Sequence, residues 1–168
     1  LDVLGLRPDS NPCHTPADRL LHRDTSGKER ESTWSYRTVL GIFNYIAMTT
    51  RPDISFAVIQ CARFAEKSKQ SHEQALKRIG RYLLKTKERG LIINPNEECQ
   101  LKCFVDADFA GLWKVEDPED KKSATSRTGF VLTYAGIPIA WCSKLQSLIA
   151  LSTTEAEYMV LSQSMREL

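Results

Sequence analysis

At 168 residues the chain has room for one medium domain or two small ones, and its 42% hydrophobic and 26% charged residues are ordinary for a globular protein. No apolar run approaches the roughly 20 residues that a membrane helix requires, and the N-terminal residues lack the basic and apolar regions of a signal peptide. The five cysteines follow no zinc-binding spacing, so reduced thiols in an intracellular protein are expected. The net charge of +2 identifies no class of partner by itself.

The charge is distributed unevenly along the chain. Residues 1–98 carry sixteen Lys or Arg against twelve Asp or Glu, whereas residues 99–168 carry seven against nine. A basic first part and an acidic second part predict two units, 1–98 and 99–168. The sequence starts without Met and stops within a helical pattern, so we expect both ends to be cuts in a longer protein.

The first half of the chain reads as a lead-in followed by helices. Residues 1–33 are polar and rich in turn residues, which predicts an extended segment that packs little. Apolar residues at helical spacing predict a helix over Tyr36–Met48. The next helix is expected to start with Thr50 as N-cap and Asp53 as its capping-box partner, and to run to about Ala65.

A third helix is expected to start at Ser71, with Gln74 three residues on. Its apolar stripe comprises Ala75, Leu76, Ile79, Tyr82 and Leu83, and its opposite face carries Lys77, Arg78, Arg81 and Lys85. A solvated helix face accounts for such a basic stripe, and so does a helix that follows nucleic-acid phosphates. The stripe alone does not separate these readings.

The hydrophobic period changes from helical to alternating after Gly90. The alternation predicts a short strand at Leu91–Ile93 and a longer one over residues 101–106, and residues 113–126 read as a charged loop. Two further strands, Gly129–Tyr134 and Ile137–Cys142, are expected to be joined by a tight turn at residues 135–136.

The last element is predicted to be a helix opened by a capping box between Ser152 and Glu155. Its buried stripe is expected to consist of Tyr158, Leu161, Met165 and Leu168.

Two pairs of acidic residues could carry chemistry. Asp106 and Asp108 lie at the end of a predicted strand, and Glu155 and Glu157 lie in the first turns of the last helix. Carboxylates from a strand and a neighbouring helix can share Mg²⁺, and phosphodiester hydrolysis commonly uses two such ions. The structural alternative is that Glu155 only caps its helix and Asp108 only starts a loop.

Several long motifs, taken together, resemble the Pol proteins of copia-type LTR retrotransposons. They occur in the family's order and spacing and span nearly the whole chain from about Thr15 on. The matching stretches are Tyr36–Gly41 (YRTVLG), Tyr45–Val58 (YIAMTTRPDISFAV), His72 to Thr86 ending in YLLKT, Phe104–Gly111 (FVDADFAG), Lys122–Phe130 (KSATSRTGF), Ile139–Gln146 (IAWCSKLQ) and Leu151–Tyr158 (LSTTEAEY).

The resemblance implies an α+β protein with a helical, thumb-like end of a reverse transcriptase over 1–98. Residues 99–168 would be the first half of an RNase H-like domain, a mostly antiparallel sheet with one packed helix that cuts RNA in RNA–DNA hybrids with Mg²⁺. Asp106 and Glu155 match the first two catalytic, metal-binding carboxylates. Lys77, Arg78, Arg81 and Lys85 would contact phosphates of the hybrid or of a template–primer duplex.

The sequence lacks some of the acidic residues that the family pattern includes. The later RNase H carboxylates and the polymerase aspartates do not occur in these residues, so we expect weak Mg²⁺ binding and no robust activity of the chain alone. The rest of the Pol polyprotein is an expected partner, in the cytoplasm or a virus-like particle. A non-catalytic nucleic-acid-binding or structural remnant of a decayed element is the competing hypothesis.

Overall fold

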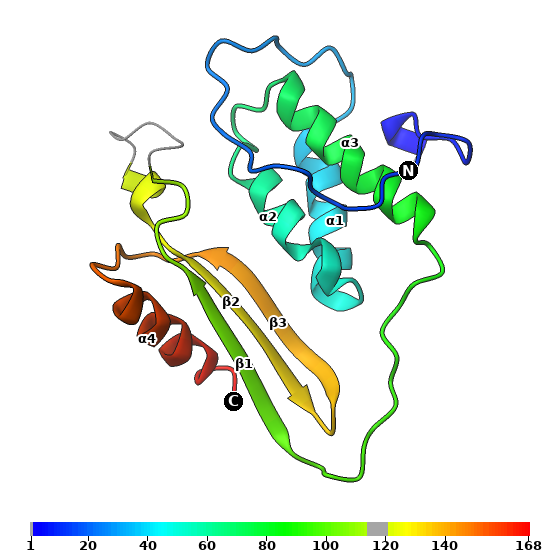
Figure 1. Ribbon diagram of the computed structural model, residues 1–168. Helices are drawn as coiled ribbons and strands as arrows, with labels where there is room; N and C mark the ends of the chain where they lie inside the picture. Colours follow the sequence, from blue (N-terminus) through cyan, green and yellow to red (C-terminus); the bar gives the residue numbers. More distant parts are fainter. Residues whose placement is uncertain (1, 114–120) are drawn as a thin grey trace. The chain divides into compact units, whose positions relative to one another are not determined.

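The computed structural model describes residues 2–113 and 121–168. The chain divides into two compact units, Leu1–Gly90 and Leu91–Leu168, each of which is described by itself. The division lies between Gly90 and Leu91, whereas the charge distribution had suggested residues 98 and 99. Figure 1 shows helices in the first unit and a sheet with one helix in the second.

Three helices form the first unit: α1 (Tyr36–Thr49), α2 (Ser55–Ala62) and α3 (Gln70–Lys85). Helix α1 follows its apolar pattern closely, and Ser35 caps it by accepting a hydrogen bond from the Thr38 N–H. The apolar stripe predicted for α3 is confirmed, because its large members Leu76, Ile79, Tyr82 and Leu83 are all buried.

The predicted start of the second helix is wrong. Thr50 ends α1 instead, since its N–H donates to the Ile46 carbonyl, and a 3-10 turn over Pro52–Ile54 precedes α2. Asp53 does not close a capping box, because its carboxylate accepts two hydrogen bonds from the Arg51 guanidinium and one from the Tyr82 hydroxyl. A tertiary contact with α3 has taken the place of a local cap.

The predicted start of α3 also differs from the structure. The N-cap is Lys69, whose N–H donates to Nδ1 of His72 at 3.0 Å, so an imidazole supplies the acceptor that a capping box usually draws from Glu or Gln. The hydroxyl of Ser71 donates to Asp24 in the lead-in at 2.6 Å. Ser71 therefore joins two segments rather than starting the helix.

The lead-in packs more than its composition suggested, which corrects the prediction for residues 1–33. Leu4, Cys13 and Leu21 are buried in the same cluster as the helices. The Leu21 N–H donates to Gln60 of α2, and Nε2 of His72 in α3 donates to the His22 carbonyl. A polar segment can dock in this way because helix side chains satisfy its backbone groups.

The core of the first unit lies between the lead-in and the three helices. Apolar side chains with less than a tenth of their surface exposed fill it, including residues from every one of these segments. They are Leu4, Cys13, Leu21, Tyr36, Val39, Leu40, Phe43, Ala47, Ile54, Ala57, Val58, Cys61, Phe64, Leu76, Ile79, Tyr82 and Leu83.

The second unit is built on an antiparallel sheet of β1 (Leu101–Asp108), β2 (Arg127–Tyr134) and β3 (Ile137–Leu145), in the order β1-β2-β3. The predicted hairpin turn is confirmed, with Ala135 and Gly136 both at positive φ, as a type I′ turn requires. Leu91–Ile93 forms no strand, and Ile92 and Ile93 are exposed, because no neighbouring strand pairs with this segment. The predicted charged loop lies partly outside the described residues, and Lys121–Ala124 form a 3-10 turn.

Helix α4 (Thr153–Ser164) packs on β1 and β2 with a stripe of small residues. Ala156, Val160 and Ser164 are buried, whereas Tyr158 and Met165 are exposed. The predicted stripe of Tyr158, Leu161, Met165 and Leu168 is therefore wrong. Spacing alone could not choose between two apolar faces of α4, and the face with small side chains allows the closer approach to the sheet.

The predicted α+β class is confirmed, since helices form the first unit and a three-stranded antiparallel sheet with a packed helix forms the second. The second unit is consistent with the first half of an RNase H-like fold. In the described residues, no helix is long and apolar enough to cross a membrane.

Candidate functional site

Asp106 and Asp108 are both exposed and lie near the C-terminal end of β1. They alternate with Ala107, so their side chains leave the same face of the sheet. The Asp108 carboxylate lies so close to Gly111 that a Cβ at that position would collide with it. Asp108 therefore shapes the turn that follows the strand, and Asp106 is the freer of the two carboxylates.

Glu155 forms a cap at the start of α4. Its Oε2 accepts a hydrogen bond from the Leu151 N–H at 2.6 Å, and its own N–H donates to the hydroxyl of Ser152 at 3.1 Å. Half of the predicted capping box is present, because Ser152 accepts from the Glu155 N–H. The Glu155 carboxylate, however, accepts from the N–H of Leu151 and not from that of Ser152. In this structure the carboxylate of Glu155 is committed to the helix end.

Glu157 is the helix carboxylate that reaches the strand. Its Oε1 accepts a hydrogen bond at 3.2 Å from the N–H of Ala107, the residue between Asp106 and Asp108. Because β1 pairs only with β2 among the described strands, this N–H lies on an edge that a side chain can reach. The structure therefore brings Glu157, and not Glu155, to the strand that carries Asp106.

The choice between the two glutamates depends on which face of α4 is buried. Glu157 follows the buried Ala156 directly, and a residue next to the buried stripe lies at the border between helix and sheet. Glu155 lies in the first turn, where the orphan N–H groups compete for its carboxylate. The family motif matches Glu155, and the contact between Glu157 and Ala107 could not be read from the sequence.

Oxygen donors at the edge of β1 suit a hard cation such as Mg²⁺. The two candidates are the exposed carboxylates of Asp106 on β1 and of Glu157, which accepts a hydrogen bond from the next residue of that strand. Among the described residues, no group of three or more His, Cys, Asp or Glu side chains is arranged to hold a metal ion. Two carboxylates of this kind are a weak site by themselves.

Gln146 positions the helix that carries Glu157, a role that the sequence analysis does not predict. It is buried, its N–H donates to the Ser126 carbonyl, and its Nε2 donates to the Ala156 carbonyl at 3.0 Å. It thus ties the end of β3 to the first turn of α4. The burial of Gln146 and its partners are tertiary features, so the sequence carries no local signal for this role.

The basic face predicted on α3 is partly engaged within the unit. Lys77 forms an ion pair with Glu73 at 2.7 Å. Arg78 donates to Asp18 at 3.1 Å and also to the carbonyl and hydroxyl of Thr15. A phosphate would have to compete with these partners.

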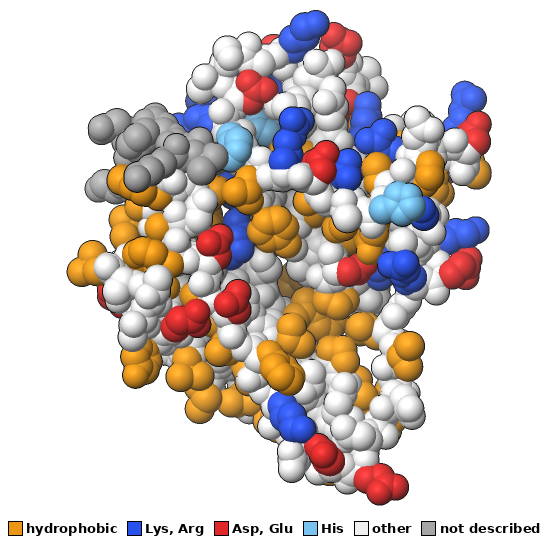
Figure 2. All heavy atoms as spheres, viewed as in Figure 1, with side chains coloured by type: hydrophobic (Ala, Val, Ile, Leu, Met, Phe, Trp, Pro, Cys, Tyr) orange, Lys and Arg blue, Asp and Glu red, His pale blue; other side chains and the backbone are white. Residues whose placement is uncertain are grey.

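The other two basic residues have different surroundings. Lys85 is exposed, with its Nζ 3.0 Å from Nε2 of His14. Arg81 is half-buried beside a cavity. Figure 2 shows Lys and Arg side chains at the surface of the unit that contains α3. Lys85 is therefore the most accessible of the four candidates for a nucleic-acid contact.

Known proteins resemble the chain over most of its length. It is 32% identical over 167 residues to the retrovirus-related Pol polyprotein from transposon RE2 of Arabidopsis thaliana, covering 99% of this chain and 11% of that protein. It is 39% identical over 133 residues to the corresponding polyprotein from transposon TNT 1-94 of Nicotiana tabacum, covering 79% of this chain and 9% of that protein. The chain thus spans about a tenth of the length of these relatives.

A shorter relative is also similar. The secreted RxLR effector protein 161 of Plasmopara viticola is 37% identical over 132 residues, which cover 79% of this chain and 87% of that protein. No family model and no solved structure matches the chain. The similarity to several transposon polyproteins over most of the chain shows that it belongs to the family of retrovirus-related Pol polyproteins of copia-type transposons.

Proposed function

We propose that the chain is the junction of a reverse transcriptase and its RNase H domain, and that its second unit takes part in Mg²⁺-dependent hydrolysis of the RNA strand of RNA–DNA hybrids. The observation that supports this most is the hydrogen bond from the Ala107 N–H to Glu157, which brings a helix carboxylate to the strand that carries Asp106. Carboxylates from a strand and a neighbouring helix can together hold the metal ions that a metal-dependent nuclease uses.

In this proposal Asp106 and Glu157 hold the metal ion, and Glu155 keeps its capping role. Mg²⁺ bound there would supply the positive charge that activates water and stabilises a leaving oxygen. We expect the remaining ligands to come from the rest of the Pol polyprotein, so that this chain alone binds Mg²⁺ weakly and cleaves poorly. The first unit would contribute nucleic-acid contacts through the basic face of α3, with Lys85 as its most accessible member.

Manganese used as a paramagnetic substitute for Mg²⁺ tests the site in the chain itself. We expect Mn²⁺ to broaden the amide NMR signals of residues 105–108 and of the first turns of α4. The broadening should be lost in Asp106→Asn and in Glu157→Gln and retained in Glu155→Gln. Loss in Glu155→Gln with retention in Glu157→Gln would show that Glu155 is the metal ligand and would refute the role proposed for Glu157.

Cleavage of a labelled RNA–DNA hybrid tests the activity in a longer Pol polypeptide that contains this chain. Asp106→Asn and Glu157→Gln should each abolish Mg²⁺-dependent cleavage, whereas Lys85→Gln should weaken hybrid binding and reduce its salt dependence. Salt-dependent binding of hybrid without any cleavage, in the longer polypeptide as in the chain, would favour the non-catalytic remnant instead.

A further inference from the structure

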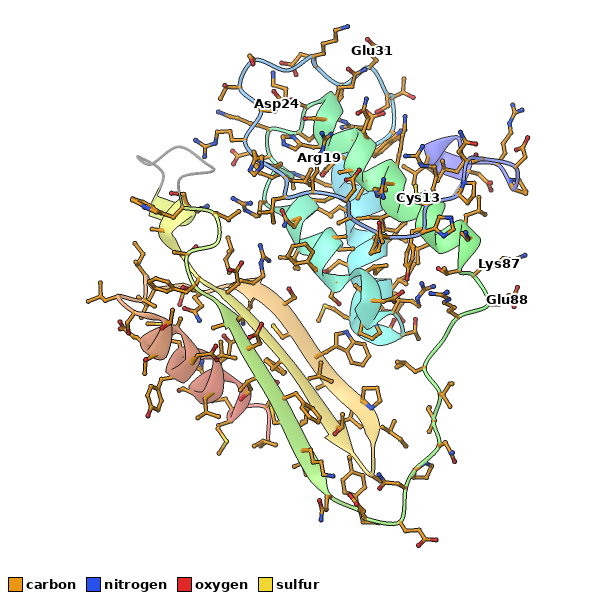
Figure 3. The ribbon with its side chains drawn as sticks, viewed as in Figure 1. Cys13, Arg19, Asp24, Glu31, Lys87 and Glu88 are labelled. Atoms are coloured by element: carbon orange, nitrogen blue, oxygen red, sulfur yellow. The ribbon has the colours of Figure 1, made fainter. Side chains whose placement is uncertain are left out.

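A cavity of about 130 Å³ lies within the first unit, between the lead-in and helices α2 and α3. Residues 16–19 and Leu21 of the lead-in form one wall, and Gln60 and Arg81 belong to the opposite walls. Figure 3 labels Arg19 on this part of the lead-in. A single water requires only about 10–15 Å³, and an engineered cavity of about 150 Å³ admits benzene, so this space accommodates a compact polyatomic group.

Gln60 leaves a hydrogen-bond donor at this cavity without an acceptor. Its side chain is 1% exposed, and its Oε1 accepts the Leu21 N–H at 3.0 Å. Because a backbone N–H can only donate, the oxygen must face Leu21, and the amide nitrogen Nε2 is left over. Within residues 2–113 and 121–168, this Nε2 has no hydrogen-bond partner.

Arg81 adds a second buried hydrogen-bond donor without an acceptor. Its Nε is buried and also has no hydrogen-bond partner among the residues that the structure describes. Buried polar groups in native proteins almost always have a partner, either in the protein or in an ordered water or other bound molecule. Two unpaired buried donors in the lining of one cavity indicate that a group with acceptor oxygens belongs there.

The charges around the cavity favour an anion. Its lining contains three arginines, Arg19, Arg78 and Arg81, against the single carboxylate of Asp18. That carboxylate is paired with Nη1 of Arg78, whose Nε and Nη2 donate to the carbonyl and the hydroxyl of Thr15. The guanidinium group is the side chain best shaped for phosphate oxygens.

We propose that this cavity binds a phosphate group, either free phosphate or the terminal phosphomonoester of a nucleotide, through Gln60 Nε2 and Arg81. Bound there, the anion bridges α2 and α3 and holds the lead-in over them. The proposal concerns the first unit and does not depend on the metal site of the second.

Isothermal titration of the chain with inorganic phosphate and with a nucleoside monophosphate, at constant ionic strength set with chloride, tests the proposal. Gln60→Glu keeps the oxygen that accepts the Leu21 N–H but replaces the donor by an anionic oxygen, and Arg81→Gln removes the guanidinium. Each variant should weaken binding by about tenfold or more. Arg89→Gln removes an exposed guanidinium that follows α3 and lies outside the cavity lining, so it is the matched control and should bind as the parent does.

Saturable binding of both ligands would support the cavity as a general phosphate site, and binding of one ligand only would identify its source. No saturable binding by the parent chain would overturn the proposal, and so would an equal loss in Arg89→Gln, which would indicate general surface charge. Circular dichroism checks that each variant is folded. If Gln60→Glu does not fold, the comparison of Arg81→Gln with Arg89→Gln tests the proposal.

Discussion

The two units of this chain bury their apolar residues to very different extents. The first unit has a continuous core with contributions from the lead-in and all three helices. In the second, few large side chains such as Phe130, Leu132 and Val160 are buried, while many others remain exposed. Figure 2 shows these apolar side chains at the surface around α4 and the sheet.

The difference indicates where each unit obtains its stability. The first unit combines apolar burial with ion pairs and hydrogen bonds that link distant segments, such as Arg51 with Thr86 and Arg30 with Glu73. The second unit relies on strand pairing and on one helix whose buried stripe is narrow. Large exposed apolar surfaces usually mark places where another protein surface binds. We therefore expect the first unit to be the more stable when the chain is studied alone.

Removing a core side chain should have the largest effect. Leu76 is fully buried, so Leu76→Ala should lower the free energy of unfolding of the first unit by about 2–5 kcal/mol. Leu161→Ala in α4 is the matched control, because Leu161 is 45% exposed and its loss should change stability by about 0.5 kcal/mol or less. Urea unfolding measures both, and equal effects would contradict the contrast between the units.

The Arg51 network should give the next largest effect. Arg51 is buried and donates to the Asp53 carboxylate and to both the carbonyl and the hydroxyl of Thr86. Arg51→Met should cost the first unit about 2–3 kcal/mol, because Asp53 and Thr86 would lose a charged donor. Arg89→Met, at an exposed position, serves as the control in the same urea experiment. If the two variants were equally stable, the packing of α1, α2 and α3 would not depend on the hydrogen bonds of Arg51.

The capping roles in α4 should give a smaller effect on the second unit. Ser152→Ala and Glu155→Ala should each reduce stability by about 1 kcal/mol, since each removes a side chain that satisfies an N–H at the helix start. Glu157→Ala should leave stability almost unchanged while weakening the binding of Mn²⁺. Thermal unfolding followed by circular dichroism separates the two carboxylates. A larger loss from Glu157→Ala than from Glu155→Ala would reverse their assigned roles.

The pH dependence of the first unit should give the smallest effect. Burial lowers the pKa of the His72 imidazole below its ordinary value of 6.5, and its unprotonated Nδ1 accepts the Lys69 N–H. Below pH 6.5 the unfolded chain therefore binds more protons than the folded one. The contribution of His72 to the free energy of unfolding should be fully present above pH 6.5. It should decrease on acidification until the pH falls below the pKa of His72 in the folded state.

The variant His72→Gln keeps an acceptor for the Lys69 N–H but does not titrate. It should abolish the loss of stability that begins near pH 6.5. The losses due to Asp53 and Glu73 should remain and should begin only at lower pH. Burial opposes ionisation of both carboxyls, but hydrogen bonds from Arg51 and Tyr82 to Asp53, and from Lys77 and Ser32 to Glu73, outweigh it and hold both pKa values below their ordinary range. Urea unfolding at a series of pH values provides the comparison, and an unchanged profile in His72→Gln would rule out His72 as its source.

Much of the fold could be predicted because local patterns and tertiary packing agree. The long helices α1 and α3 and the hairpin of β2 and β3 follow from periodicity and turn residues, and their positions are confirmed. Predictions failed where a distant partner replaced a local one. Asp53 bonded to Arg51 and Tyr82 rather than closing a cap, and Ser71 bonded to Asp24 rather than starting α3.

By itself, the sequence determined the family, the α+β order of elements and the presence of carboxylates on one strand and one helix. Only the tertiary structure decided that Glu157 reaches Ala107 while Glu155 turns back to Leu151. The reason is physical: two glutamates two residues apart point in different directions from a helix, and their partners depend on which face of α4 packs on the sheet. That face was chosen by the close approach of Ala156 and Val160, which no local pattern encodes.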